Sequence, residues 1–166
     1  INTLVENEGS SGDKVNLDSD YVATLTDTTI TATVLNVVDG NVPGSVNAST
    51  VETITGIAAD INTAYASSGI SGLGNEEVII TDTGSVAASD LNTINGATTG
   101  LITATSVANL TGAAADINTL VENEGSSGDK VNLDSNYLVT ITDTGSVAAS
   151  DLNTINGCLL YTSPSP

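Results

Sequence analysis

The sequence lacks most of the side chains on which catalytic and metal sites depend. Its 166 residues include no histidine, methionine, tryptophan or phenylalanine, and one cysteine, Cys158. Without histidine, Ser-His-Asp triads and the usual zinc ligand sets are excluded, and one cysteine forms no disulfide within the chain. Four tyrosines are the only aromatic residues, so the core must be built from small aliphatic side chains. Such a core suits a narrow, repetitive fold better than a large globular one.

Positive charge is almost absent. Two lysines, Lys14 and Lys130, oppose 20 acidic residues, and the formal net charge is -18. A chain of this charge repels nucleic acid and anionic membranes, and it suits a medium whose salt or divalent cations screen self-repulsion. No apolar run has the length of a membrane-spanning helix. Because Val, Ile and Leu are plentiful and regularly placed, a disordered acidic chain is not expected.

What the sequence has in abundance is internal repetition. Two long segments recur unchanged and a third recurs with substitutions. The matching pairs are 1–19 with 117–135, 80–96 with 141–157 and, more loosely, 44–63 with 100–119.

A Leu-Asn or Ile-Asn pair marks each half of a larger repeat. The pairs begin at Ile1, Leu35, Ile61, Leu91, Ile117 and Leu152, and successive pairs are 34, 26, 30, 26 and 35 residues apart. Half-units of about 26–35 residues running through 1–157 predict a solenoid, in which each unit stacks only on its neighbours.

Within a half-unit the apolar pattern changes from a period of two to a period near 3.6. The first predicts strands in which aliphatic residues alternate with threonine. The second predicts short helices, such as one through Leu152 and Ile155 with Ser146 as N-cap and Gly157 as its stop. The predicted strands are Val22–Thr28, Ser45–Ser49, Glu77–Thr83, Leu101–Thr105 and Tyr137–Thr144.

This alternation predicts an α/β repeat solenoid in which parallel strands alternate with short helices. A parallel β-solenoid with helical corners is the alternative.

Clusters of oxygen donors make calcium the one metal to consider. Asp18 and Asp20 lie in one cluster, and Asp134 and Asn136 lie in its repeat. Calcium binds several such oxygens at close range. However, neither an EF-hand loop nor the glycine-rich calcium-binding nonapeptide is present. The alternative is that these residues form Asx-turns and solvate loops.

The recurrence of aspartate argues against catalysis. Paired carboxylates on a solenoid can cleave polysaccharides, but an active site is normally unique within a fold. A carboxylate near a helix start stabilises the macrodipole and bonds free amides, which explains why it recurs. The equivalent helix positions are Asp60, Asp90, Asp116 and Asp151. We therefore expect no enzyme, and we assign no catalytic or cofactor-binding residue.

Three recurring strings carry a family resemblance. They are Ala-Ala-Asp-Ile-Asn-Thr, Ala-Ser-Asp-Leu-Asn-Thr-Ile-Asn-Gly and Ile-Thr-Asp-Thr. Over 1–157 the sequence resembles repeat regions of very large proteins of marine bacteria, especially picocyanobacteria. The resemblance implies a cell-surface or secreted protein, sometimes with calcium-binding repeats and exported by a one-step secretion system.

The last nine residues, Cys158–Pro166, break off a repeat in mid-course. They resemble the translation of a transposase-type sequencing adapter. We therefore expect a tandem-repeat fragment over 1–157 and a non-native tail over 158–166.

Together these observations predict a non-enzymatic structural or adhesive repeat segment of a bacterial extracellular or cell-surface protein. Its expected partners are neighbouring repeats of the same chain, then surface polysaccharide or other cells, without nucleic acid and without membrane insertion. No cofactor is expected, calcium being the one alternative. The rival functions are an extracellular polysaccharide-degrading enzyme domain and a calcium-dependent repeat module.

Overall fold

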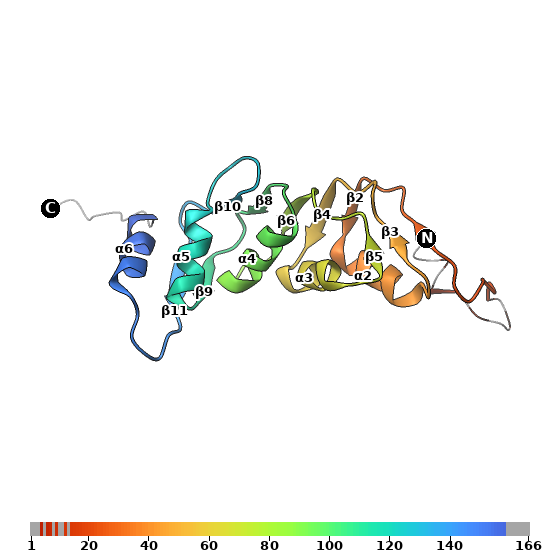
Figure 1. The fold of residues 1–166 in the computed structure, drawn as a ribbon, viewed down its shortest axis with the longest axis horizontal. Coiled ribbons are helices and arrows are strands. Elements are labelled where there is room, and N and C mark those ends of the chain that lie inside the picture. Colours follow the sequence, from red (N-terminus) through yellow and green to blue (C-terminus); the bar gives the residue numbers. More distant parts are fainter. Residues whose placement is uncertain (1–3, 5, 8, 10–11, 13, 159–166) are drawn as a thin grey trace.

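The chain is an α/β protein in which parallel strands in three sheets alternate with short helices. A computed structural model describes residues 4, 6–7, 9, 12 and 14–158. The molecule is elongated, and its helices follow one another along its length in chain order (Figure 1).

Helices of 9 or 10 residues form a row along one side of the molecule (Figure 1). Each packs against the next one in the chain. In the first four the buried stripe begins with the first residue, an alanine, and continues three and six positions later, as with Ala88, Leu91 and Ile94. The helices are α2 (Ala32–Asn41), α3 (Ala58–Ala66), α4 (Ala88–Ala97), α5 (Ala114–Glu122) and α6 (Ala149–Cys158).

Three sheets, here sheets I, II and III, form the rest of the fold, and all their strand pairs are parallel. Sheet I contains β1 (Ala23–Thr24), β3 (Val46–Asn47) and β5 (Ile70–Ser71). Sheet II contains β2 (Thr29–Thr31), β4 (Thr53–Gly56), β6 (Glu77–Ile80), β8 (Ile102–Ala104) and β10 (Val131–Leu133). Sheet III contains β7 (Ser85–Ala87), β9 (Asn109–Gly112) and β11 (Leu138–Ile141).

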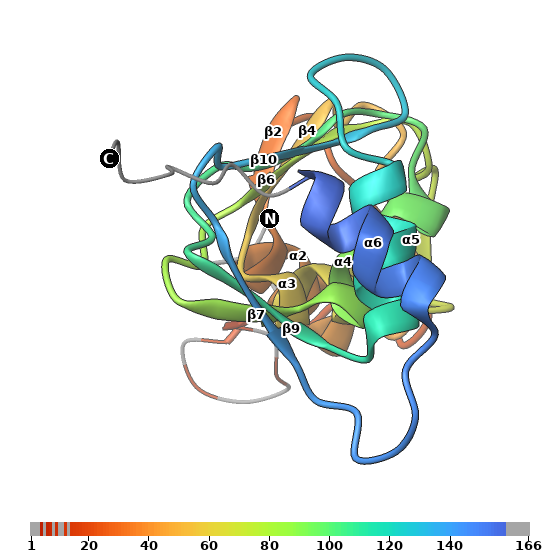
Figure 2. The same ribbon diagram turned by 90° about the vertical axis from the view of Figure 1, so that its left-hand side faces the viewer.

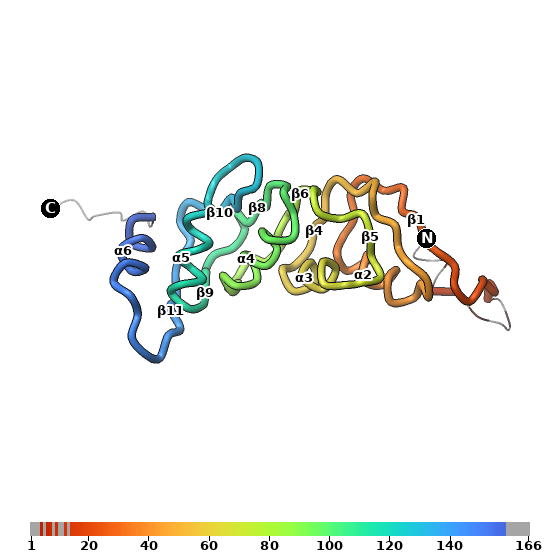
Figure 3. Tube along the Cα trace, in the orientation of Figure 1, coloured from red at the N-terminus to blue at the C-terminus, as the bar shows by residue number. Residues whose placement is uncertain are grey.

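Sheet II runs the length of the molecule in register. One inward row joins Ile30, Ile54, Val78, Ile102 and Val131, and each of these side chains is at most 8% exposed. The first three steps are 24 residues long and the last is 29. The longer step contains the loop between α5 and β10, which projects beyond its neighbours (Figure 3).

The segments between successive helices are of two kinds. A two-strand segment joins α2 to α3 through β3 and β4, and another joins α4 to α5 through β8 and β9. A three-strand segment joins α3 to α4 through β5, β6 and β7. This segment contributes one strand to each of the three sheets. β5 is the last strand of sheet I, β6 belongs to sheet II and β7 is the first strand of sheet III.

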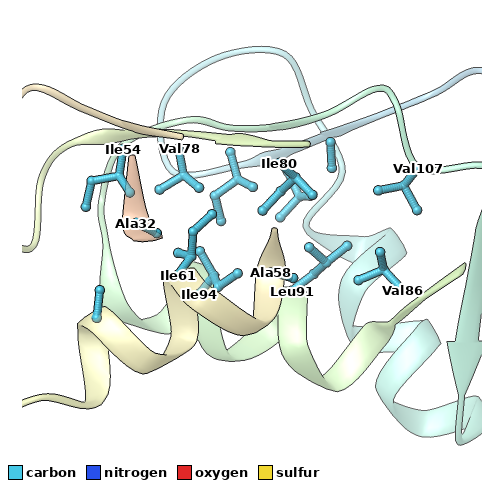
Figure 4. Packing of buried hydrophobic residues seen from close by; sticks show 14 of the residues in the cluster. Ala32, Ile54, Ala58, Ile61, Val78, Ile80, Val86, Leu91, Ile94 and Val107 are labelled. Carbon is cyan, nitrogen blue, oxygen red and sulfur yellow. The ribbon is translucent and has the colours of Figure 1, made fainter. Parts of the chain in front are cut away.

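The core is a continuous band of Ala, Val, Ile and Leu between the strands and the helix row. In Figure 4, Ile54 and Val78 of sheet II face Ile61 of α3, and all three are 0% exposed. Seen along the molecule, the helices lie on one side of this band, with sheets II and III around the others (Figure 2). Tyr137 is the one aromatic member of this otherwise aliphatic core among the described residues.

Glycine is required where a two-strand segment leaves its helix and approaches the preceding segment. A Cβ on Gly100 would lie 2.2 Å from the carbonyl oxygen of Glu76. At Gly44, the equivalent position, a Cβ would lie 2.5 Å from the carbonyl oxygen of Tyr21. Both distances are too short for any side chain, so the recurring glycine permits close stacking.

Several sequence predictions need correction. The predicted strands are real but shorter, and the strands directly before the helices, β2, β4, β7 and β9, were not predicted. Ser146, the predicted N-cap, lies three residues before α6 begins at Ala149, so it is not at the cap position. In the first copy of the same sequence the N-cap of α4 is Ala87, which makes no side-chain cap bond. Gly157 lies within α6 rather than stopping it. The final Leu159–Pro166 of the expected tail lies outside the described residues.

Candidate functional site

The residues proposed for calcium form turns at separate places in the fold. The backbone N–H of Asn136 donates to Asp134 Oδ1 at 2.7 Å, and that of Asp20 donates to Asp18 Oδ1 at 3.4 Å. Both are Asx-turns, the alternative considered for these clusters. Hydrogen bonds from Asp20 lower the pKa of Asp18. One turn precedes β1 and the other precedes β11, at opposite ends of the molecule (Figure 3).

The nearby acids that the structure describes do not complete either cluster. In the part of the chain that the structure describes, no three Asp, Glu or Cys side chains are placed to hold a metal ion together. Glu124, upstream of the second turn, instead accepts from the Tyr137 hydroxyl at 3.5 Å. Burial raises the pKa of Glu124. Glu8 and Asp13, upstream of the first turn, lie outside the described residues.

Two aspartates for which the sequence predicts no capping role each cap the helix that precedes their own segment. The N–H of Ala58, the first residue of α3, donates to Asp82 Oδ2 at 2.8 Å. The N–H of Ala114, the first residue of α5, donates to Asp143 Oδ2 at 2.7 Å. Both helices need this help, because their own N-cap residues make no side-chain cap bond. These carboxylates therefore join one segment to the next.

In three of the recurring Leu-Asn and Ile-Asn pairs the asparagine joins neighbouring helices. The aliphatic residue, Leu35, Ile61 or Leu91, is buried in the core, and the asparagine beside it donates to a backbone carbonyl in the first turn of the next helix. The bonds run from Asn36 Nδ2 to the Asp60 carbonyl (2.9 Å), from Asn62 Nδ2 to the Asp90 carbonyl (3.3 Å) and from Asn92 Nδ2 to the Asp116 carbonyl (2.9 Å). At these three positions the pair that marks the repeat in the sequence also bonds one helix to the next. Asn118, beside Ile117, instead donates to Glu122 Oε1 of its own helix.

The recurring helix aspartates lie where the sequence placed them, in the first turn of their helices. There the negative charge of each aspartate interacts favourably with the helix macrodipole. Asp60 also accepts a hydrogen bond of 2.7 Å from the Thr33 hydroxyl of the preceding helix.

Glu76 is the one acidic side chain that the described structure buries, at 1% exposure. Its carboxylate accepts from the Tyr65 hydroxyl, from Gly74 N at 2.8 Å and from Asn75 N at 3.2 Å. Its carbonyl accepts from the Thr98 hydroxyl at 2.7 Å. Burial, and then the hydrogen bond and charge of Glu76, raise the pKa of Tyr65. Through these bonds the buried carboxylate holds the chain between β5 and β6 against α3.

A related pair occurs in the segment between α5 and α6, with the residue types exchanged. Tyr65 lies in α3 and its partner Glu76 precedes β6, whereas Glu124 follows α5 and its partner Tyr137 precedes β11. Burial, and then the charge of Glu124, raise the pKa of Tyr137. Each pair ties the stretch just before the second strand of its segment to the helix before that segment or to the residues that directly follow this helix.

No protein-family model, curated protein or solved structure matches the chain. Among the helices in the described ranges, none combines the length and the apolarity that crossing a bilayer requires. The recurring polar side chains are engaged by neighbouring segments, and their geometry supports assembly of the stack.

Proposed function

We propose that the chain is a non-enzymatic structural segment, a stretch of α/β solenoid that serves as spacer or adhesive scaffold in a bacterial extracellular or cell-surface protein. The solenoid description is supported by helices that pack in chain order and by the in-register row of sheet II. Helices of 9 or 10 residues favour it over a β-solenoid with helical corners.

The observation that carries the proposal is the use made of the repeated polar residues. Asp82 and Asp143 cap helices of the preceding segment, and three asparagines bond the following helix. A residue that connects two segments is needed in every repeat, because every repeat makes the same contact with its neighbour. A catalytic residue is needed once. The pattern therefore fits a protein whose function depends on length and surface.

The composition fits an external location. A charge of -18 and one cysteine suit a salty medium in which carboxylates are screened and no disulfide is needed. The resemblance to large repetitive proteins of marine bacteria supports the same location. An antiserum against the chain should then label intact, unpermeabilised cells of the source organism, and labelling only after permeabilisation would contradict this part of the proposal.

Small-angle X-ray scattering tests the spacer function. Two copies of 1–157 are joined by the sequence 97–116, which connects the same flanking sequences inside the chain. The proposal predicts that the longest dimension about doubles while the cross-sectional radius of gyration stays constant. A joined protein of larger cross-section and unchanged length would contradict it.

The rival enzyme function is tested by incubation with acidic and neutral polysaccharides. The spacer proposal predicts no new reducing ends and no unsaturated products. Activity that survives purification and is lost on substitution of a single aspartate would favour the rival.

A further inference from the structure

Neighbouring segments of the stack are joined by backbone hydrogen bonds that run mainly along the long axis of the molecule. The strand pairs of the three sheets join adjacent segments, as β4 with β6 and β6 with β8. In sheet II the strands follow one another along the molecule, and the bonds between them share that direction (Figure 1). A force along the axis therefore pulls these bonds apart instead of sliding one strand past another.

The direction of the force decides how many hydrogen bonds resist it at once. Sliding two paired strands past each other breaks every bond of the pair together, whereas pulling them apart breaks the bonds one after another. The pairs are also short, since β4 and β6 share four registered residues and β3 and β5 share two. Each interface between segments therefore opposes an axial force with few bonds at a time.

The side-chain bonds described above likewise link a segment to its direct neighbour. Asp82 bonds the first residue of the preceding helix, and Asn62 and Asn92 each bond the following helix. With one cysteine, the chain forms no disulfide that would tie segments together. In a stack of this kind the stability is approximately the sum of the segments and of the contacts between neighbours. One segment can then be released while the next interface stays closed.

Release of one segment lengthens the molecule by far more than the segment occupies in the stack. A folded segment adds about 5 Å along the sheets and about 8–10 Å along the helix row. Successive Leu-Asn or Ile-Asn pairs lie 26 to 35 residues apart, and a chain of that many residues spans about 90–120 Å when extended. Each released segment therefore becomes at least about tenfold longer.

We propose that the chain is an extensible spacer, which lengthens under an axial pull by releasing one segment at a time and shortens again when the pull ends. The proposal rests on the spacer function proposed above and adds a mechanical function to it. Each opened interface provides length before the next one is fully loaded, so the force on an attachment is limited. Refolding follows from the same topology, because the adjacent folded segment presents the strands and the helix on which the released segment forms again.

Single-molecule force spectroscopy on the full chain, held by its two ends, tests the proposal. The exposed Cys158 is replaced by serine, so that added cysteines form the only disulfide. The expected record is a series of steps, each of which lengthens the chain by about 80–120 Å. On relaxation the chain should shorten in steps, and a second pull should show the same series.

A disulfide between two adjacent segments shows whether a step is the release of a segment. Thr55 of β4 and Ile79 of β6 are registered partners that point away from the buried Ile54 and Val78. Registered residues of neighbouring strands lie about 5 Å apart, within the range that a disulfide spans. The oxidised Thr55→Cys, Ile79→Cys chain should lose about 80 Å of its total lengthening and keep its other steps. The reduced form of the same chain is the matched control and should regain that length.

Three results would overturn the proposal. The first is a single event that lengthens the chain by about 500 Å, because the interfaces would then open together. The second is an oxidised chain, shown by thiol titration to carry the disulfide, that lengthens as much as its reduced form. The third is a chain that does not shorten on relaxation. None of these results contradicts the spacer function, whereas scattering that shows no doubling of length would contradict both.

Discussion

The chain contains two identical 17-residue segments, and replacing the matching leucine in each one separates the effect of stacking on stability from the effect of local sequence. Leu91 and Leu152 lie at the same position of identical 17-residue segments, at 0% and 43% exposure. Burying a leucine side chain fully stabilises by about 1.5–3 kcal/mol, and removing one from a closed core costs about 2–5 kcal/mol because a cavity remains. We expect Leu91→Ala to lower the free energy of unfolding by about 3 kcal/mol.

For Leu152→Ala the expected loss is about 1 kcal/mol, because a little over half of the side chain is covered and its open side leaves no enclosed cavity. Urea unfolding followed by helical circular dichroism measures both variants against the parent chain. Leu35→Ala, at a third equivalent position that is 0% exposed, should resemble Leu91→Ala. Equal losses for Leu91→Ala and Leu152→Ala would refute the reasoning, since they would show that the following segment contributes nothing.

The remaining predictions concern the polar contacts. Asp82→Ala removes the cap of α3 and should lower the free energy of unfolding by about 1 kcal/mol in urea titration, whereas Asp27→Ala, at an exposed position, should have no measurable effect. Tyr65→Phe leaves buried Glu76 without one donor and should cost about 1–3 kcal/mol; a neutral result would mean that the hydroxyl does not hold the carboxylate. Because burial raises the pKa of Glu124, the folded chain binds this proton more tightly than the unfolded chain, so its stabilisation is present at acidic pH and is lost as the pH rises through the raised pKa. Glu124→Gln should remove that part of the pH dependence of the melting temperature. Calcium in place of a chelator should leave the melting temperature unchanged, and a clear rise would favour a calcium-dependent module.

The helices and the parallel α/β class follow from the sequence because their signals are local. A stripe such as Leu91 and Ile94 has helical spacing, and threonine alternates with aliphatic residues in β11. The strands before the helices were missed because each carries one inward aliphatic residue, such as Val86 in β7. They form through pairing with a later segment. The identical residues 146–148 are not a strand, so no local pattern could have predicted both outcomes.

The polar contacts were predicted only in outline. Recurrence indicated that the aspartates are structural, and Asp60 is indeed placed in the first turn of its helix. The capping role of Asp82 was not foreseen, because its partner Ala58 lies 24 residues earlier. The asparagines had a visible signal, since one follows each marker leucine or isoleucine. However, only the packing of neighbouring helices shows that Asn92 bonds the next one.

Native-state hydrogen exchange tests most directly whether each segment is stabilised by the one that follows it. The amides of 80–96 and 141–157 have the same sequence, hence nearly the same intrinsic exchange rates, so any difference in protection reports structure alone. The account predicts strong protection in 80–96, including the amides of β7 and α4. In 141–157 it predicts weak protection, with 146–148 exchanging close to the intrinsic rate. Equal protection of the two copies would contradict it.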